Sequence, residues 1–321
     1  MTIGISMPNG NARWVRDAET IVDQLAETGM DITIEVMYAN NSVETQYASV
    51  ELFIAEEVDC LVIACVDPYS LTDLLEEAEA AGIPVIAYDR LPMNTDAVSY
   101  YTTFDNRAVG VLQGEYIVDA LDLEHAGSKT YNIEYVTGDL DDNNATIFFD
   151  GALSVLQPYI DAGTLVCPSG QITREETATK WWDTANAQTR FEDILANHYS
   201  DGTHLDAVLA SNDSTAMGVT NALTAFGMSD YVLTGQDCDL EAVRNIVSGT
   251  QSMSVFKDSG IMARHTAQMV LDIVSGQEPE INDTATYSIP SYLCLPTVVT
   301  ADNYEELLID SGYYTKAEIL G

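Results

Sequence analysis

The sequence is poor in basic residues: 12 Lys and Arg stand against 51 Asp and Glu, so the formal net charge is −39 over 321 residues. A surface of this sign repels both nucleic-acid phosphates and anionic lipid headgroups. Long hydrophobic runs are missing too, because no apolar stretch reaches the roughly 18 residues of a membrane-spanning helix. We therefore expect neither a nucleic-acid partner nor a segment that crosses a membrane.

Motifs for catalysis, phosphate binding and metal binding are also missing. The sequence has no GxGxxG after a strand, and no GxxxxGK[ST], GxSxG or HExxH pattern. None of the four histidines, His125, His198, His204 and His265, lies near a carboxylate cluster at ligand spacing. We therefore expect that the protein is not an enzyme and that it has no cofactor and no metal.

Cysteine pairs give no further constraint. The five cysteines form no CxxC pair and their number is odd; they are Cys60, Cys65, Cys167, Cys238 and Cys294. This pattern predicts neither a disulfide framework nor a zinc site. Because free cysteine behaves as a small buried hydrophobe, we expect these side chains in the core.

One acidic run resembles the start of a calcium loop. Asp139, Asp141 and Asn143 occupy its first, third and fifth positions, but Asn144 replaces the glycine that such a loop requires. The same run also suits a helix N-terminus, where side-chain oxygens cap free amides, or a polar ligand site. Calcium binding within 139–150 stays open at this point.

Apolar runs of strand length alternate with amphipathic stretches of helix length. In the first half we expect strands at 3–6, 32–38, 60–65, 85–88 and 98–104, and helices at 12–27, 43–56 and 68–82. In the second half we expect strands at 131–136, 164–166, 207–210, 231–234 and 253–256. The helices expected there are at 144–156, 179–197, 214–226 and 240–247, followed by a long helix after residue 256 that ends at about 275. Continuous hydrophobicity favours parallel strands covered on both faces. The predicted fold class is α/β, with two doubly wound parallel-sheet lobes.

No low-complexity linker separates the two halves. The connection after Phe104 runs directly into the next helix near Ala108, which is typical of a hinge rather than a flexible tether. Residues 279–296 hold three of the nine prolines and break the pattern of helices. We expect the chain to cross between the lobes again there, and the tail at 304–320 to form a terminal helix.

Rare residue types gather where the predicted strands end. In doubly wound sheets, ligands bind beyond the carboxyl ends of the strands. The side chains that follow these ends are Asn11, Arg13 and Trp14; Asp89 and Arg90; Asp105 and Asn106; Asp142, Asn143 and Asn144; Trp181, Trp182 and Asp183; Asn212 and Asp213; Gln236 and Asp237; and Lys257. All three tryptophans and three of the few basic residues belong to this set.

These residue types suit a neutral polyol. Asp, Asn and Gln offer paired hydrogen bonds, and Arg and Lys donate charge-assisted ones. An indole face packs on the apolar face of a pyranose while polar groups at its edge bind the hydroxyls. The pattern therefore predicts a sugar site.

In these segments the chain resembles the type I periplasmic sugar-binding proteins of ABC importers, and most of all the xylose-binding and multiple-monosaccharide-binding members. The segments that carry the resemblance are 12–14, 85–90, 104–106, 142–145, 235–237, 255–257, 289–293 and 310–313. The resemblance implies sugar-binding residues at Arg13, Trp14, Asp89, Arg90, Asp142, Asn144, Trp182, Asn212, Asp237 and Lys257, with Asn106 as a neighbour. Trp182 is preferred to Trp181 because it precedes Asp183, as in the family.

The resemblance also implies a function and a domain organisation. An extracytoplasmic protein of this kind captures a monosaccharide such as xylose, glucose or galactose in an interlobe cleft, closes on it, and delivers it to an ABC permease. The implied lobes are 1–105 with 258–290 and 106–257 with 291–321, joined by a three-strand hinge.

Several points stay open. The alternatives are the sugar-sensing effector core of a transcription regulator, or a sensor coupled to a chemoreceptor. We expect a monomer that is periplasmic or lipid-anchored to the outer face of the cell membrane, with its export signal absent from this sequence.

Overall fold

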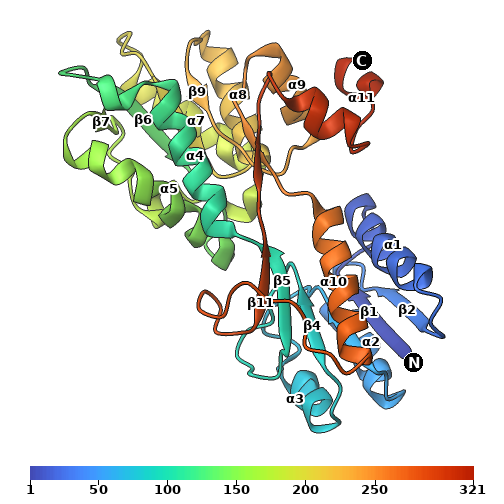
Figure 1. Cartoon of the computed structure of the whole chain (residues 1–321). Helices are drawn as coiled ribbons and strands as arrows, with labels where there is room; N and C mark the ends of the chain where they lie inside the picture. The colour runs from blue at the N-terminus through green and yellow to red at the C-terminus, as the bar shows by residue number, and fades with distance from the viewer. The chain divides into compact units, whose positions relative to one another are not determined.

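The computed structural model describes the backbone of residues 1–321 and every side chain except that of residue 12. The chain divides into two compact units, which we call unit 1 and unit 2 (Figure 1). Unit 1 consists of Met1–Phe104 and Asp258–Leu295, and unit 2 of Asp105–Lys257 and Pro296–Gly321.

The unit boundaries differ slightly from the predicted ones, which fall after residues 105, 257 and 290. The side chain of Asp105 caps the first helix of unit 2 by accepting from Ala108 N at 2.8 Å, so Asp105 belongs to unit 2. The last strand of unit 1, β11 (Ser291–Cys294), pairs with β5 (Tyr100–Phe104) and keeps the chain in unit 1 up to Leu295. The predicted boundary at 290 is therefore five residues too early.

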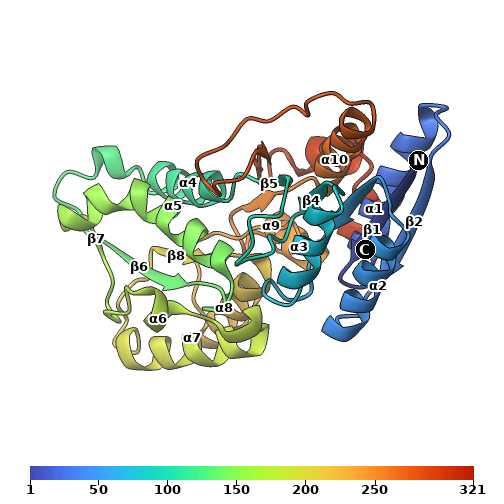
Figure 2. The ribbon, with the colours of Figure 1, turned by 90° about the horizontal axis from the view of Figure 1, so that it is seen from below.

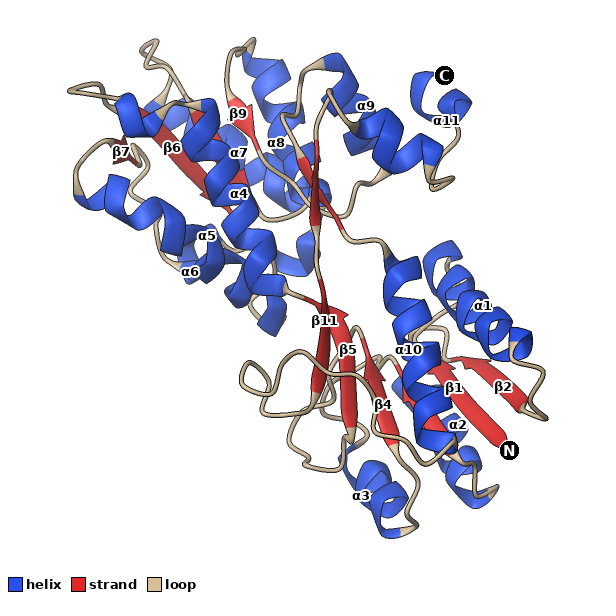
Figure 3. Cartoon of the chain, viewed as in Figure 1, coloured by secondary structure: helices blue, strands red, loops and turns tan.

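Unit 1 is built on a parallel sheet of order β11-β5-β4-β3-β1-β2. Its further strands are β1 (Thr2–Met7), β2 (Thr33–Tyr38), β3 (Cys60–Ile63) and β4 (Val85–Tyr88). Its helices are α1 (Ala12–Glu27), α2 (Val43–Ala55), α3 (Thr72–Ala80) and α10 (Ser259–Val274) (Figure 3). The expected helix at 68 begins four residues later, at Thr72.

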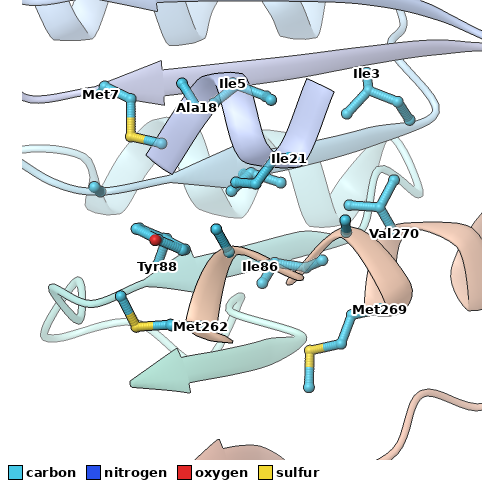
Figure 4. Close-up of a cluster of buried hydrophobic side chains, with 14 of the residues drawn as sticks. Ile3, Ile5, Met7, Ala18, Ile21, Ile86, Tyr88, Met262, Met269 and Val270 are labelled. Atoms are coloured by element: carbon cyan, nitrogen blue, oxygen red, sulfur yellow. The ribbon is translucent and has the colours of Figure 1, made fainter. Parts of the chain in front are cut away.

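Alternate side chains of these strands face two separate cores, as the period of a strand requires. Ile3 and Ile5 of β1 pack with Ile21 of α1 and with Met262 and Val270 of α10 on one face (Figure 4). On the other face, residues of β3 and β4 pack against α2 and α3. Continuous apolar strands therefore form a sheet covered on both sides, as predicted.

Unit 2 has a smaller parallel sheet of order β7-β6-β8-β9. Its strands are β6 (Tyr131–Val136), β7 (Leu165–Val166), β8 (Ala207–Ala210) and β9 (Val232–Leu233). A separate antiparallel pair joins β10 (Ser254–Phe256) to β12 (Thr297–Val299). This pair is an exception to the predicted parallel arrangement, and it brings the returning chain into unit 2.

Two layers of helices cover the sheet of unit 2. Figure 2 shows α4 (Asn106–Ala120) and α5 (Asn143–Asp161) on one side of β6 and β8, and α7 (Thr184–His198) and α8 (Asp213–Phe226) on the other. The remaining helices are α6 (Arg174–Thr177), α9 (Leu240–Ser248) and α11 (Lys316–Leu320), with short turns of other helical types at Leu123–His125, Lys180–Trp182 and Glu305–Asp310. Among the residues described, no helix is long and apolar enough to cross a membrane.

Two predicted helices of unit 2 are different in the structure. The helix expected from residue 179 begins only at Thr184, because Trp181 and Trp182 have φ angles of 60° and 56° in the left-handed region. The helix expected at 304–320 is a π-helical turn at Glu305–Asp310 followed by α11. Gly312 separates these two pieces with a φ of 80°, a conformation that favours glycine.

Close packing of α4 on α5 depends on two glycines. A Cβ added at Gly110 would lie 1.9 Å from the backbone oxygen of Phe148, and one at Gly151 would lie 2.4 Å from the backbone oxygen of Arg107. The backbones of the two helices can therefore approach only without side chains at these positions. This contact holds the N-terminal half of α5 against α4.

The five cysteines are all free. Cys60, Cys65, Cys238 and Cys294 are buried, as expected for small hydrophobes, whereas Cys167 is half-buried. Burial raises the pKa of the Cys60 thiol to about 12. The thiols of the four buried cysteines are therefore packing groups rather than nucleophiles.

Candidate functional site

The predicted residues of unit 1 lie together where β1 and β4 end. We define the unit 1 cluster as Arg13, Trp14, Asp17, Asp89 and Arg90. Arg13 is in the first turn of α1, and its Nη2 donates to Asp89 Oδ2 at 3.0 Å in a half-buried ion pair. Because both strands are parallel, their carboxyl ends bring these two residues to one edge of the sheet.

Trp14, one of the predicted sugar-binding residues, is largely buried beside Arg13 and Arg90. Its side chain is only 5% exposed and belongs to the core next to α10. The edge of its ring meets Tyr88, with the ring centroids 6.4 Å apart. Arg13 Cζ and Arg90 Cζ lie 4.6 and 5.3 Å from the ring centroid, within the range of cation–π attraction. The geometry makes Trp14 a support for two guanidinium groups.

Asp89 and Arg90 form the turn directly after β4. Asp89 has a φ of 61°, and its backbone oxygen accepts from Tyr101 Oη at 2.7 Å. Arg90 is exposed, and its Nη1 donates to the backbone oxygen of Cys65 at 3.4 Å. Hydrogen bonds from neighbouring strands thus hold the left-handed turn that aims the Asp89 carboxylate at Arg13.

A second group of predicted residues lies in unit 2. We define the unit 2 cluster as Asn106, Asp142, Asn144, Phe148, Trp182, Asp237 and Lys257. Asp142 is the N-cap of α5 and accepts from Asn144 N at 2.9 Å. Asn144 Oδ1 in turn accepts from Asn106 Nδ2 at 3.0 Å, which links the first turns of α4 and α5.

The two adjacent tryptophans differ sharply. Trp182 is half-buried; its Nε1 donates to Asp142 Oδ2 at 3.2 Å, and its ring meets Phe148 at a centroid distance of 6.3 Å. Trp181 is 73% exposed, with Lys180 Nζ 4.4 Å from its ring centroid. The choice of Trp182 over Trp181 as the stacking residue is therefore consistent with the contacts of the two rings.

The cation of the unit 2 cluster is Lys257, the last residue before the chain enters unit 1. Its Nζ lies 2.9 Å from Asp237 Oδ1 and 5.6 Å from the centroid of the Phe148 ring. Asp237 has a φ of 96°, and its backbone N donates to Val255 O at 2.9 Å. The loop after β9 is thereby fixed against β10, so that carboxylate and ammonium face each other.

Asn212 is the N-cap of α8. It is 8% exposed, and its Oδ1 accepts from Thr215 N at 3.0 Å in a capping box with Thr215. This bond stabilises the first turn of the helix. The predicted sugar contact of Asn212 thus falls on a side chain whose oxygen already caps a helix.

Sequence reasoning missed two members of these clusters. Asp17 stands four residues after Arg13, and Phe148 stands four residues after Asn144. Because residues four apart share one face of a helix, this spacing was a usable signal for both. Neither side chain belongs to the polar residues and tryptophans that directly follow the predicted strands, so neither was in the predicted set.

The acidic run at 139–144 contains the N-cap of α5, Asp142. Asp139 Oδ1 accepts from Asp141 N at 2.9 Å, Asp139 Oδ2 accepts from Trp181 N, and Asp142 caps α5. Across all residues with a described side chain, no group of three or more His, Cys, Asp or Glu side chains is placed to hold a metal ion.

A family model described as periplasmic binding protein domain matches residues 3–278, so the chain belongs to this family. The chain is 42% identical, over 98% of its length and 90% of the relative's, to the multiple sugar-binding periplasmic receptor ChvE of Rhizobium radiobacter. It is 33% identical, over 96% of its length and 88% of the relative's, to the D-xylose-binding periplasmic protein of Escherichia coli.

A solved structure agrees with these relatives. A crystal structure of an ABC transporter solute-binding protein from Clostridium phytofermentans, with bound β-D-glucose, matches with a TM-score of 0.87 and 48% identity, covering 99% of this chain and 100% of that chain. The predicted family and α/β fold class are confirmed, as is the prediction of a binding protein rather than an enzyme. The regulator and sensor alternatives are not favoured by these relatives.

Proposed function

We propose that this protein captures a monosaccharide outside the cytoplasm and delivers it to the permease of an ABC importer. The observation that carries the proposal is the unit 2 cluster, where the indole of Trp182, fixed by Asp142, shares Phe148 with the Lys257–Asp237 pair. An aromatic face beside fixed donors and acceptors suits the two kinds of surface on a pyranose.

The unit 1 cluster supplies the same chemistry. Arg13 and Asp89 pair a donor group with an acceptor group, and Arg90 adds a second cation. In both units a carboxylate is paired with a cation, so each pair hydrogen-bonds hydroxyls while adding no net charge. We infer that the sugar contacts are Arg13, Asp89, Arg90, Asp142, Asn144, Trp182, Asn212, Asp237 and Lys257, with Trp14 beside Arg13 and Arg90.

The names of the relatives support a pentose or hexose in its ring form as the ligand. One solved relative holds β-D-glucose, another relative is named for D-xylose, and a third for several sugars. In their pyranose forms, glucose and xylose share the hydroxyls at C1, C2, C3 and C4 and differ by the hydroxymethyl group at C5. We therefore expect D-xylose and D-glucose to bind best, and D-galactose less well.

The partner and the location follow from the same family. A solute-binding protein of an importer meets its permease on the outer side of the membrane, and the curated relatives are periplasmic. A monomer is sufficient for this role, since each cluster is built from a single chain. The finer alternatives, free in a periplasm or held by a lipid anchor, are distinguished by whether detergent is needed to extract the native protein from cells.

The test is a thermal-shift screen over D-xylose, D-glucose, D-galactose, L-arabinose and L-fucose, followed by calorimetry. We expect a Kd of about 1 μM for the best sugar, which corresponds to roughly −8 kcal/mol. Asp89→Ala in unit 1 and Trp182→Ala in unit 2 should each abolish binding of that same sugar, while the neighbouring Trp181→Ala should keep it. A panel without any shift, or full affinity in both variants, would contradict the proposal.

A further inference from the structure

We propose that Asp17 is a positioning residue for ligand binding, whose buried carboxylate fixes the guanidinium of Arg13 and joins it to the start of α10. The inference rests on the proposed function, in which Arg13 contacts the sugar. Asp17 lies one helical turn after Arg13 on α1, and its side chain is 0% exposed.

The carboxylate of Asp17 is buried, and burial is unfavourable for a charged group. Asp17 Oδ2 lies 3.6 Å from Arg13 Nε, too far for a hydrogen bond, and no well-formed hydrogen bond reaches this oxygen, although the hydroxyl of Tyr88 interacts with the same carboxylate. A buried carboxylate oxygen without a hydrogen bond is expensive unless a cation offsets its charge. The nearby guanidinium of Arg13 is that cation.

The other oxygen of the same carboxylate has a hydrogen bond to α10. Asp17 Oδ1 accepts from Ser259 Oγ at 2.5 Å. Ser259 is the first residue of α10, and its backbone oxygen accepts from Tyr88 Oη at 3.4 Å. The chain enters unit 1 at Asp258, immediately after Lys257 of the unit 2 cluster. One carboxylate therefore holds both Arg13 and the segment that follows the crossing.

Asp17 also restricts the orientation of the Arg13 side chain. This side chain is 39% exposed and would have many rotamers in water. Asp17 attracts it at Nε while Asp89 binds it at Nη2, so the plane of the guanidinium is fixed by two carboxylates. A donor that is already oriented loses less entropy when the ligand binds.

The experiment compares Asp17→Asn with the wild type by calorimetry, using the best sugar of the panel. Asparagine keeps the size of the side chain and an acceptor for Ser259, and it removes the charge that faces Arg13. We expect the Kd to rise about tenfold, because a loosened guanidinium is misplaced by a fraction of an ångström. The matched control is Asp23→Asn, which removes an exposed charge from the same helix and should leave the Kd unchanged.

A double-variant cycle separates positioning from general destabilisation. In an Arg13→Met background, Asp17→Asn should change the Kd by less than about twofold, because the group through which it acts is gone. Where Asp17→Asn does not fold, Ser259→Ala takes its place: it keeps the charge, releases Oδ1, and should show a smaller loss that also disappears with Arg13→Met.

The pH profile is a further readout that a merely structural role would not change. Burial raises the pKa of Asp17. The titratable groups that face it are Arg13 on its own helix, Tyr88 at the end of β4 and Asp89 in the turn that follows. Sugar affinity of the wild type should fall as acid protonates Asp17, and Asp17→Asn should lack this part of the fall. Asp89 is present in both proteins, so the difference between the profiles reports Asp17.

The outcomes are distinct. A wild type that binds no sugar of the panel overturns the proposed function and this inference with it. A wild type that binds, with Asp17→Asn equal to it in Kd and in pH profile, overturns the inference alone. The inference is also overturned if Asp17→Asn raises the Kd by the same factor in the wild type and in Arg13→Met, because Asp17 would then not act through Arg13.

Discussion

Gly138 gives the sharpest test of the unit 2 cluster, because its substitution alters the indole without removing any group that binds a ligand. A Cβ added at Gly138 would lie 2.0 Å from two carbons of the Trp182 ring and 2.4 Å from a third. Ordinary contact between carbons needs about 3.5 Å or more. The indole of Gly138→Ala must therefore move by roughly 1.5 Å, the difference between these distances.

A shift of this size breaks the 3.2 Å hydrogen bond from Trp182 Nε1 to Asp142 and alters the contact with Phe148. We expect the sugar affinity to fall about a hundredfold, or roughly 3 kcal/mol, as misplacements near 1 Å can cost this much. The fold should lose only about 1–3 kcal/mol, the usual cost of overpacking.

The assay is calorimetry on Gly138→Ala, with thermal melting to show that the protein is folded. The control is the pair Trp182→Phe and Trp182→Phe/Gly138→Ala, since the smaller phenyl ring leaves room for the new methyl group. If the clash is the cause, adding Gly138→Ala to Trp182→Phe should cost little further affinity. Wild-type affinity in Gly138→Ala alone would refute the assignment of Trp182 to the binding surface.

Four further predictions concern separate parts of the molecule. Lys257→Met should weaken sugar binding by about 2 kcal/mol, or roughly 30-fold by calorimetry, because Asp237 loses its cation and the ligand loses a charged donor. Gly110→Ala should lower the melting temperature or prevent folding, because its Cβ would meet the backbone oxygen of Phe148 at 1.9 Å, whereas a wild-type melting temperature would contradict the α4–α5 contact. Native protein at pH 8 should react slowly with thiol reagents at all five cysteines, since burial raises the pKa of Cys60, Cys65 and Cys294 to about 12 and that of Cys167 to about 11, and denaturant should release all five at once. The melting temperature should rise between about 0.05 and 1 M NaCl, because salt screens the self-repulsion of a net charge of −39, and a flat curve would remove this idea.

The sequence was sufficient for the architecture and for several contacts between candidate residues within each unit, and the reason is physical. Parallel strands place their carboxyl ends at one edge, so Arg13 after β1 and Asp89 after β4 meet although 76 positions separate them. In unit 2, Asp142 follows β6, whereas Trp182 follows the short helix α6 and donates to Asp142 from there. Residues far apart in the sequence were therefore predictable as neighbours without coordinates.

Side-chain burial and backbone strain were not predictable in the same way. Trp14 and Trp182 are the same residue type in similar positions, yet one lies in a core and the other is half-buried against Asp142. The left-handed φ of Trp182 ends the helix expected from 179, and nothing in an indole favours that conformation. Both features depend on tertiary contacts, which override local preference.

The two clusters share a design that explains how so acidic a chain can hold a neutral ligand. In unit 1, Asp89 pairs with Arg13 beside the ring of Trp14, and in unit 2, Asp237 pairs with Lys257 beside the ring of Phe148. Each pair cancels its own charge, so neither pair adds to the surplus of acids. Exposed acids more than a Debye length away, about 8 Å in physiological salt, are screened. At these positions, Arg13 and Lys257 therefore each orient a carboxylate acceptor and offer a hydrogen-bond donor next to an aromatic ring.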